Sequence, residues 1–256
     1  MLSVLNHPLA DHIVTHLRDK TTKPATFRTL AYQLTLMLAI EATRDLETEP
    51  KSVETPLEST GGRVLAHEPI VVVAILRAGV SMVQPFLDVF PDVSVGYVGL
   101  ERDHATAVAR SYYTKLPALA GRRVFVVDPM LATGGSATQA LDVVKQAGAV
   151  APCLVCIIAA PEGVEAVSRR HPDASIYVAV LDRALNARKY ILPGLGDFGD
   201  RLYCNVATGA IAVFAEAEMA HDILHDDDGI VDKNPNAENQ GEQGYSINGI
   251  TQEIED

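Results

Sequence analysis

The sequence predicts an α/β protein built on a mostly parallel, five-stranded core sheet flanked by helices. Five apolar runs have the length and composition of strands that are buried on both faces. Segments with helical spacing of apolar residues separate most of these runs, which favours parallel strands joined by right-handed crossovers. The expected strands are Ile70–Leu76, Val93–Leu100, Val124–Val127, Cys153–Ala160 and Ser175–Leu181.

The segment before the first expected strand is predicted to be helical and then exposed. Leu2–Lys20 and Phe27–Ala42 both carry apolar residues at helical spacing. Lys51–His67 alternates only weakly and contains the pair Gly61-Gly62. This composition favours a surface arm or a hairpin.

Three helices and one irregular loop are expected between and after the strands. Apolar residues have helical spacing in Val80–Phe90, in Ala140–Val144 and in Glu162–His171. Tyr190–Asp200 contains four glycines or prolines within eight residues. That density excludes a regular helix and favours a shaped loop with exposed amides.

Length and composition indicate a globular protein. The chain has 256 residues, 48% of them hydrophobic, which is enough for a large buried core. No apolar run reaches the roughly 20 residues of a membrane-spanning helix, and the first residues lack the basic and apolar regions of a secretory signal. Three cysteines are too few for a disulfide framework. We therefore expect a cytoplasmic protein with no membrane partner.

The formal net charge of −12 is concentrated near the C-terminus. Residues 226–256 hold nine acidic residues and one basic residue, a charge of −8 that leaves −4 for the rest of the chain. This segment is rich in Asn, Gln and Gly and is predicted to be a disordered tail, whereas the apolar, alanine-rich residues 206–225 favour a helical extension. The negative balance argues against a nucleic-acid partner, because such binding needs a cationic surface.

The most informative stretch follows the expected strand Val124–Val127. It reads Asp128-Pro-Met-Leu-Ala-Thr-Gly-Gly-Ser136 and leads into an amphipathic helix. Open α/β sheets bind ligands at the carboxyl ends of their strands, where Asp128 stands. Glycines let the backbone approach a ligand, and successive N–H groups with two hydroxyls at a helix start form an anion site. The stretch predicts a site for a phosphate and a ribose, whereas an ordinary turn would leave the acid and the hydroxyls unexplained.

Two arginines are predicted to reach the same crevice. Arg77 follows one expected strand, beside Gly79, and Arg102 follows the next. Either one alone would more often be a surface or ion-paired arginine, but two at the ends of adjacent strands favour a second anionic group. Asp197, in the glycine-rich loop, either faces this crevice from the other side or simply caps a turn.

Cys153 and Cys156 have a spacing found in metal and redox motifs. They lie within an expected strand, where residues three apart point to opposite faces, and no second Cys or His pair accompanies them. Two buried structural thiols are therefore expected.

Several of these stretches together make the chain resemble the uracil phosphoribosyltransferases, which have the type I phosphoribosyltransferase fold. The resemblance runs from residue 7 to about residue 201. It rests on His7–Leu9, Phe27–Arg28, Glu41–Thr48, Ile75–Gly79, Asp128–Ser136, Ala159–Gly163 and Pro193–Asp197. What it implies is a phosphoribosyltransferase domain over residues 1–205, with a hood formed by N- and C-terminal segments.

The resemblance also implies an activity and a set of partners. Such an enzyme transfers ribose 5-phosphate from phosphoribosyl pyrophosphate (PRPP) to uracil, giving UMP and pyrophosphate in pyrimidine salvage. Mg²⁺ carried by the pyrophosphate would be the cofactor, with no direct protein ligand, and the chain would form a homodimer or a larger homo-oligomer. The small-molecule partners would be uracil and PRPP.

The resemblance assigns roles to individual residues. Asp128 would hydrogen-bond the ribose hydroxyls, and Arg77 and Arg102 would bind the pyrophosphate; these three are the catalytic assignments. The complete PRPP site would comprise Arg77, Arg102, Asp128, Pro129, Met130, Leu131, Ala132, Thr133, Gly134, Gly135, Ser136 and Asp197. The uracil site would comprise Ile191, Gly196, Asp197 and Phe198, largely through the main chain.

The chain departs from the family pattern at three places. Asp103–Arg110 stands where the family has a mobile flap but lacks its acidic and proline-bearing sequence. Phe198 stands where a small residue is usual, so its side chain is either harmless or crowds the base pocket. The chain also continues for roughly fifty residues beyond the usual end of the family. Two alternatives stay open: a non-catalytic, nucleotide-binding regulator of the same fold, and a phosphoribosyltransferase for another base.

Overall fold

The structure, a computed structural model, describes residues 1–66, 69–102 and 109–203, with side chains described outside residues 101–111. These ranges belong to one unit, Met1–Ala207, and a second unit, Thr208–Asp256, lies outside the described residues. The predicted helical extension over 206–225 and the predicted disordered tail over 226–256 therefore also lie outside them.

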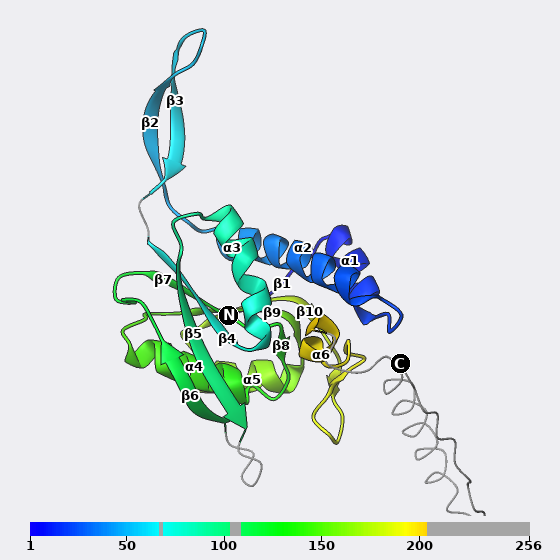
Figure 1. The fold of residues 1–256 in the computed structure, drawn as a ribbon. Coiled ribbons are helices and arrows are strands. Elements are labelled where there is room, and N and C mark those ends of the chain that lie inside the picture. Colours follow the sequence, from blue (N-terminus) through cyan, green and yellow to red (C-terminus); the bar gives the residue numbers. More distant parts are fainter. Residues whose placement is uncertain (67–68, 103–108, 204–256) are drawn as a thin grey trace, which may run out of the picture. The chain divides into compact units, whose positions relative to one another are not determined.

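The five predicted strands form a continuous parallel sheet in the order β10–β9–β7–β4–β5 (Figure 1). The central strands β4, β7 and β9 are buried almost throughout, as their unbroken apolar sequences require. The bounds are β4 (Ile70–Leu76), β5 (Ser94–Arg102), β7 (Arg123–Val127), β9 (Cys153–Ala159) and β10 (Ser175–Leu181). The predicted α/β architecture is confirmed.

Three strands that the sequence did not predict extend this sheet. β1 (Leu2–Val4) lies parallel to β10 at one edge, and β6 (Ala109–Lys115) lies antiparallel to β5 at the other. β8 (Met130–Leu131) pairs with β9 just beyond the end of β7. The sheet is therefore wider than its predicted parallel core.

The start of the chain differs from the prediction of a helix over Leu2–Lys20. Its first residues form strand β1, because their backbone pairs with β10. The helix α1 (Pro8–Arg18) begins later, with a proline that is favoured in the first helical turn. The ring Nδ1 of His7 accepts the N–H of Leu9 and so caps the helix.

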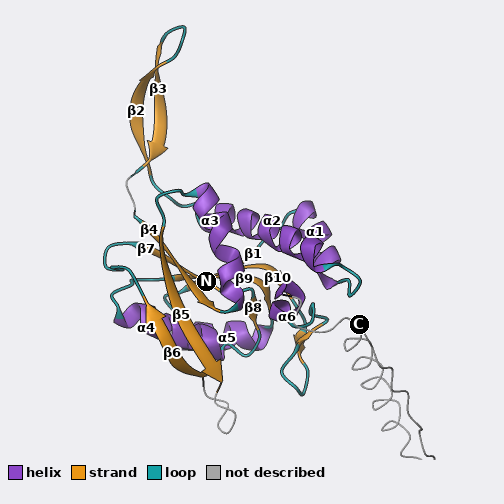
Figure 2. Cartoon of the chain, viewed as in Figure 1, coloured by secondary structure: helices purple, strands orange, loops and turns teal. Residues whose placement is uncertain are grey.

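Helices cover both faces of the sheet (Figures 1 and 2). One hydrophobic core lies between one face of the sheet and the helices α1, α2 (Pro24–Ala42), α3 (Val83–Val89) and α6 (Phe198–Tyr203). A second core lies between the other face and α4 (Gly135–Gln146) and α5 (Pro161–Arg170). The hood predicted from the two ends of the domain corresponds to α1, α2 and α6. No helix of the described ranges is both long and apolar enough to cross a membrane.

Three smaller elements complete the described fold. β2 (Thr48–Glu54) and β3 (Ser59–Leu65) form the predicted surface hairpin, which is exposed along nearly all of its length. β11 (Ala184–Leu185) and β12 (Ile191–Leu192) pair beside the glycine-rich loop. A short 3₁₀ helix, η1 (Ala78–Met82), leads from β4 into α3.

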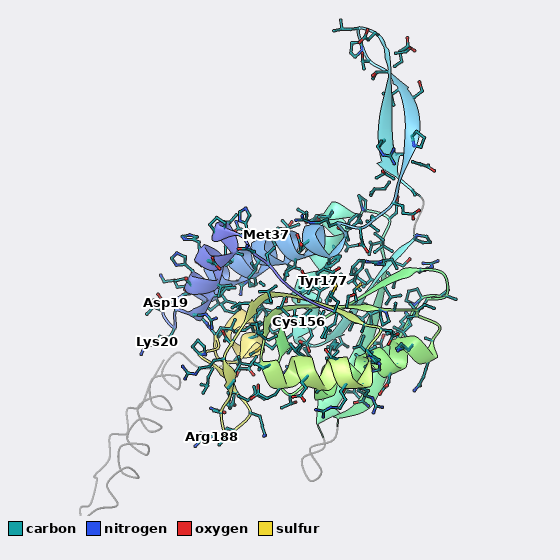
Figure 3. The ribbon with its side chains drawn as sticks, turned by 180° about the vertical axis from the view of Figure 1, so that it is seen from behind. Asp19, Lys20, Met37, Cys156, Tyr177 and Arg188 are labelled. Carbon is teal, nitrogen blue, oxygen red and sulfur yellow. The ribbon has the colours of Figure 1, made fainter. Side chains whose placement is uncertain are left out.

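Cys153 and Cys156 are both buried in β9. Cys153 belongs to the core under α1 and α2, whereas Cys156, which is labelled in Figure 3, belongs to the core under α4 and α5. The expected placement on opposite faces is confirmed. Burial raises the pKa of the Cys156 thiol well above its ordinary value, so this residue is an inert, structural thiol.

Candidate active site

The strands β4, β5 and β7 end at the same edge of the sheet, and we call the region beyond these ends the crevice, where open α/β sheets bind ligands. Asp128 follows β7, and Arg77 follows β4, the strand beside it. The turn after β4 lies directly against β7, since a Cβ on Gly79 would come within 2.4 Å of the Val127 carbonyl oxygen. Arg102 is the last residue of β5, and its side chain lies outside the described part of the chain. The fold therefore brings Arg77 and Asp128 to one crevice.

The stretch Asp128–Ser136 is fixed on one side and open on the other. The carbonyl groups of Pro129 and Leu131 accept N–H groups of β9 and of the residue after it, at 2.9–3.1 Å. Residues Met130–Ala137 line a small pocket of about 40 Å³. The sheet thus holds the loop in place while its other side can receive a ligand.

The lining of this pocket offers hydrogen-bond donors. Gly134 caps α4 in the left-handed conformation, with φ +80°, and the first N–H groups of a helix have no partner within it. The Thr138 hydroxyl lies 2.9 and 3.0 Å from the carbonyl oxygens of Gly134 and Gly135 and occupies these acceptors. Among the described residues, the hydroxyls of Thr133 and Ser136 have no protein partner. Unpaired donors at a helix N-terminus are suited to an anion such as phosphate.

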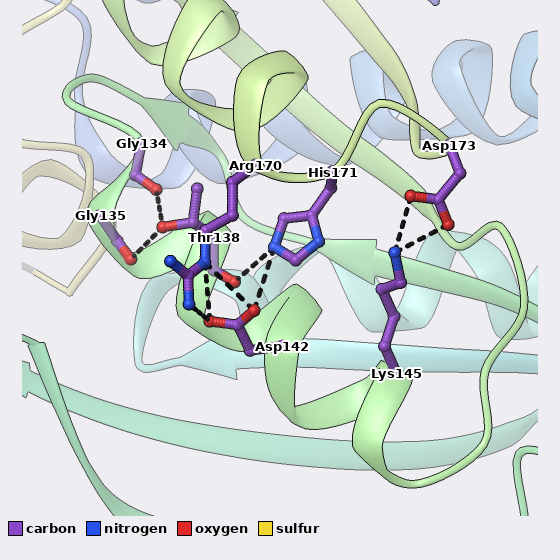
Figure 4. A network of polar contacts seen from close by, with 8 residues as sticks. All are labelled: Gly134, Gly135, Thr138, Asp142, Lys145, Arg170, His171 and Asp173. Atoms are coloured by element: carbon purple, nitrogen blue, oxygen red, sulfur yellow. Dashed lines mark hydrogen bonds and ion pairs between the residues drawn. The ribbon is translucent and has the colours of Figure 1, made fainter.

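Polar contacts hold α4 against the end of α5 beside this pocket (Figure 4). Asp142 accepts hydrogen bonds from Nε and Nη2 of Arg170 at 3.0 and 2.7 Å and lies 3.4 Å from Nε2 of the buried His171. The same ring nitrogen lies 3.0 Å from the Thr138 carbonyl oxygen. Exposed ion pairs contribute little to stability. The main support of α4 is therefore its buried face, formed by Ala137, Ala140, Leu141 and Val144.

Substituting Gly134 with alanine is expected to destabilise the protein. Holding alanine in the left-handed conformation costs about 1–2 kcal/mol, and the new Cβ would lie 2.9 Å from the Cβ of Ala166, a crowding that adds on the order of 1 kcal/mol. Thermal melts would measure the effect against two controls. Gly121→Ala has the same strain without neighbours within 4 Å, and Gly135→Ala has neither. We expect the melting temperature to fall in the order Gly135→Ala, Gly121→Ala, Gly134→Ala; equal values for the last two would contradict the crowding.

Asp128 is a partly buried carboxylate directly after the end of β7. Burial raises its pKa to about 7, and the Met130 N–H, 3.5 Å from Oδ1, opposes this rise. An ionised carboxylate has two acceptor oxygens and can accept from two neighbouring hydroxyls of a sugar. A strongly shifted pKa in a crevice is typical of a functional group.

Two acids of the glycine-rich loop belong to the same electrostatic environment. Burial and the charge of Asp197 raise the pKa of Asp200, and the charge of Arg77 lowers it. Asp197 itself is exposed and caps α6, because its Oδ1 accepts the Asp200 N–H at 2.9 Å. One of the two predictions made for Asp197 from the sequence, that it caps a turn, is therefore confirmed for its Oδ1 atom. Sequence reasoning missed Asp200; the available signal was a second acid three residues after the first.

Phe198 does not enter the crevice. Its ring is 1% exposed and packs edge-on against Phe27 of α2, with ring centroids 5.0 Å apart. The side chain therefore fills the core between α2 and α6 and leaves its backbone beside the exposed Gly196. Of the two possibilities raised for Phe198, the inward orientation of its ring agrees with the harmless one.

No group of three or more His, Cys, Asp or Glu side chains in the described ranges could hold a metal ion by itself. Asp128 nevertheless provides hard oxygen donors at the end of β7, and Asp197 provides exposed ones beside Asp200. Mg²⁺ usually keeps several waters and is held through one or two carboxylates together with substrate phosphates. These residues therefore fit a Mg²⁺ ion that arrives with a phosphate-bearing substrate.

Comparisons with known proteins agree with this geometry. A family model described as uracil phosphoribosyltransferase matches residues 4–205. The uracil phosphoribosyltransferase of Thermus thermophilus is 48% identical over 203 residues, which cover 79% of this chain and 98% of that protein. The enzyme of the same name from Symbiobacterium thermophilum is 49% identical over 201 residues, covering 78% and 96%. A solved protein structure from Aquifex aeolicus superposes with a TM-score of 0.75 at 39% identity, covering 81% of this chain and all of the other.

Proposed function

The chain belongs to the uracil phosphoribosyltransferase family, and we propose that it carries out the family reaction in the crevice where β4, β5 and β7 end. It has the type I phosphoribosyltransferase fold, and it transfers the ribose 5-phosphate unit of PRPP to uracil in pyrimidine salvage. The products are UMP and pyrophosphate. The observation that supports this placement is the pocket of unpaired donors at the start of α4, next to an aspartate at the end of β7.

Each part of PRPP has a proposed partner in the crevice. Ala132–Ser136 would surround the 5′-phosphate with N–H groups and hydroxyls, and Asp128 would accept from the ribose hydroxyls. Arg77 and Arg102 would bind the pyrophosphate. Negative charge builds on that group as its bond to C1′ breaks, so the two guanidinium groups would stabilise the transition state more than the bound substrate.

We propose Mg²⁺, carried by the pyrophosphate, as the cofactor. The carboxylates that would hold it, through the substrate and its waters, are Asp128 and Asp197. When bound, the ion would neutralise charge on the leaving pyrophosphate. No residue of the chain needs to be a direct metal ligand for this role.

Uracil would be recognised by the main chain of the glycine-rich loop. Its edge has two carbonyl oxygens with an N–H between them, so backbone donors and acceptors complement it. Ile191, Gly196 and Phe198 would supply these groups, next to Asp197. The inward orientation of the Phe198 ring supports this, because it leaves the backbone unobstructed.

A base panel tests the proposed reaction. Incubation of the protein with PRPP and Mg²⁺ is expected to give UMP from uracil and no nucleotide from cytosine or purine bases, as measured by chromatography. Excess EDTA should abolish the product. Tight UMP binding without turnover would instead identify the protein as a regulator, and product with a different base would overturn the choice of uracil.

We also propose that the protein is a cytoplasmic homo-oligomer. Buried thiols at Cys153 and Cys156 suit a reducing compartment. The hairpin β2–β3 is exposed on both strands, and a depression of about 480 Å³, lined mostly by apolar residues, lies at its base. A second copy of the chain would cover this surface, and light scattering of the purified protein measures whether a dimer or a larger oligomer forms.

A further inference from the structure

A partly buried ion pair joins α1 to the end of β10 next to the glycine-rich loop. Asp182 follows β10 and is 6% exposed. The guanidinium group of Arg18, the last residue of α1, donates from Nη2 to Oδ1 at 2.5 Å and from Nη1 to Oδ2 at 2.9 Å. This bidentate geometry fixes the plane of both groups. The two residues are 164 positions apart in the sequence, so only the fold brings them together.

The same ion pair captures both backbone groups of Gly194. The Gly194 N–H donates to Asp182 Oδ2 at 2.8 Å, and the Gly194 carbonyl accepts from Arg18 Nη1 at 2.8 Å. Gly194 is left-handed, with φ +65°, and a Cβ there would lie 2.2 Å from the Ile191 carbonyl oxygen. The loop thus folds back on itself at a residue that has no side chain to hold it. Its position depends on the ion pair.

Arg201 of α6 makes a second connection between the loop and α1. Its Nη1 donates to the Leu195 carbonyl at 2.7 Å and also to the Leu17 carbonyl, and its Nη2 donates to the Asp19 carbonyl at 2.6 Å. Figure 3 shows Asp19 at the end of α1. The carbonyls at the C-terminus of α1 lack helical partners, so Arg201 satisfies them and ties them to the loop. The glycine-rich loop is therefore positioned from α1 on two sides.

From these contacts we propose that Arg18 and Asp182 are positioning residues for the base: they hold Gly194 so that the loop backbone from Ile191 to Phe198 fits the edge of uracil. This rests on the proposed function, which places uracil on that backbone. Neither side chain touches the substrates in this assignment. Their effect would appear in the affinity for uracil, because the proposed PRPP site is built mainly on β4, β5, β7 and α4. Its one residue from this loop, Asp197, is held separately by the Asp200 N–H.

The pair is better explained by positioning than by stability. Replacing a buried ion pair by well-packed neutral residues is often neutral or stabilising, so stability alone does not require charges here. What the charges provide is two directed hydrogen bonds to one another and one more to each backbone group of Gly194 in a defined geometry. Recognition by backbone groups needs such geometry, because the main chain has no rotamers with which to adjust.

Arg18→Gln is expected to raise the KM for uracil by about 10- to 100-fold, the range for lost hydrogen bonds to a charged group. The KM for PRPP and kcat should change by less than about threefold. Arg18→Lys keeps the charge but not the fork geometry, so its uracil KM should lie between those of the wild type and Arg18→Gln. The double variant Arg18→Gln/Asp182→Asn contains no unpaired buried charge; it should fold even where a single variant does not, and its uracil KM should remain raised.

Arg169→Gln is the matched control, since Arg169, on the exposed face of α5, pairs with Glu165 and with no other residue that the structure describes. It should leave both KM values unchanged. Folded variants with a wild-type uracil KM, or with uracil and PRPP KM values raised equally, would overturn the positioning role. Faster amide hydrogen exchange in residues 190–197 of the double variant is the expected readout that does not depend on turnover, and wild-type exchange there would also overturn it. A wild-type protein that makes no UMP would refute the proposed function instead, a distinct result.

Discussion

Replacing Asp128 with asparagine is expected to lower kcat/KM for PRPP by roughly 100-fold, the effect of removing a charged hydrogen-bond partner from a transition state. The carboxylate can accept from both ribose hydroxyls, whereas an amide offers one acceptor oxygen and a donor. Because Asn keeps the shape of the side chain and the acceptor for the Met130 N–H, folding should survive. Steady-state kinetics with PRPP varied at saturating uracil measure the loss.

The same substitution is expected to stabilise the ligand-free protein above pH 7. The pKa of Asp128 is raised by burial from 3.8 to about 7, so the folded protein holds this proton more tightly than the unfolded chain does. Stability therefore falls as the pH rises from about 4 to about 7 and stays lower above that window. Asn does not titrate and escapes this loss. A shift of about three pKa units sets an upper limit near 4 kcal/mol, and partial exposure of the carboxylate reduces our expectation to about 2 kcal/mol.

Thermal melts of Asp128→Asn and wild type at pH 4 and pH 8 test this expectation. A difference of about 2 kcal/mol corresponds to roughly 4–8 °C in a protein of this size. The variant should melt higher at pH 8, and the two proteins should converge at pH 4. Asp173→Asn is the control with the opposite sign, because Lys145 lowers the pKa of Asp173 and this substitution should destabilise at pH 8. An Asp128→Asn protein that melts lower than wild type at pH 8 would contradict the burial argument.

The pH dependence of wild-type activity should show the same raised pKa of Asp128. The pH dependence of kcat/KM reports the ionisation of the free enzyme. With PRPP as the varied substrate, kcat/KM should rise with pH, with a midpoint near pH 7, and then level off. Asp128 loses its proton in this range and becomes the acceptor that the ribose needs. The combination of lost activity and gained stability in one variant is typical of a side chain kept for function at a cost in folding free energy.

The parts of the fold that could be predicted from the sequence are those with a strong local signal. Short, unbroken and β-branched apolar runs such as Ile70–Leu76 are typical of strands buried on both faces, and the order strand, acid, glycines, helix predicted the loop at Asp128. Strands β1 and β8 have three and two residues, too short for any periodicity, and exist only because β10 and β9 offer partners. Their formation depends on tertiary context.

The parts of the site that could not be predicted depend on contacts between distant segments. Arg18 and Asp182 carry no motif, and nothing in either neighbourhood indicates a shared partner at Gly194. The direction of the Phe198 ring was equally open from the sequence, and the contact with Phe27 decides it. Asp200 was missed for the same reason, since its proximity to Arg77 follows from how α6 packs.

Arg77→Gln is the second substitution with a large expected effect: kcat should fall by about 100-fold, as expected when one preorganised donor is removed from a developing anion. Arg77 is exposed at the end of β4, so the change should leave the core intact. The KM for PRPP and the inhibition constant for pyrophosphate should rise, while the KM for uracil should stay near the wild-type value. Arg77→Lys should retain part of the activity, because it restores the charge but not the planar fork.

Product inhibition by pyrophosphate separates the proposed role of Arg77 from a simple loss of charge in the crevice. Burial and the neighbouring Asp197 raise the pKa of Asp200, and the charge of Arg77 lowers it. Removing Arg77 therefore raises the pKa of Asp200 further. If Arg77 acts on the leaving group, Arg77→Gln must weaken pyrophosphate inhibition, and Asp200→Asn must leave that inhibition intact. If Arg77 serves only to neutralise Asp200, the double variant Arg77→Gln/Asp200→Asn should recover wild-type kcat. Recovery would remove Arg77 from the leaving-group site, because a guanidinium that binds pyrophosphate cannot be replaced by deleting an acid.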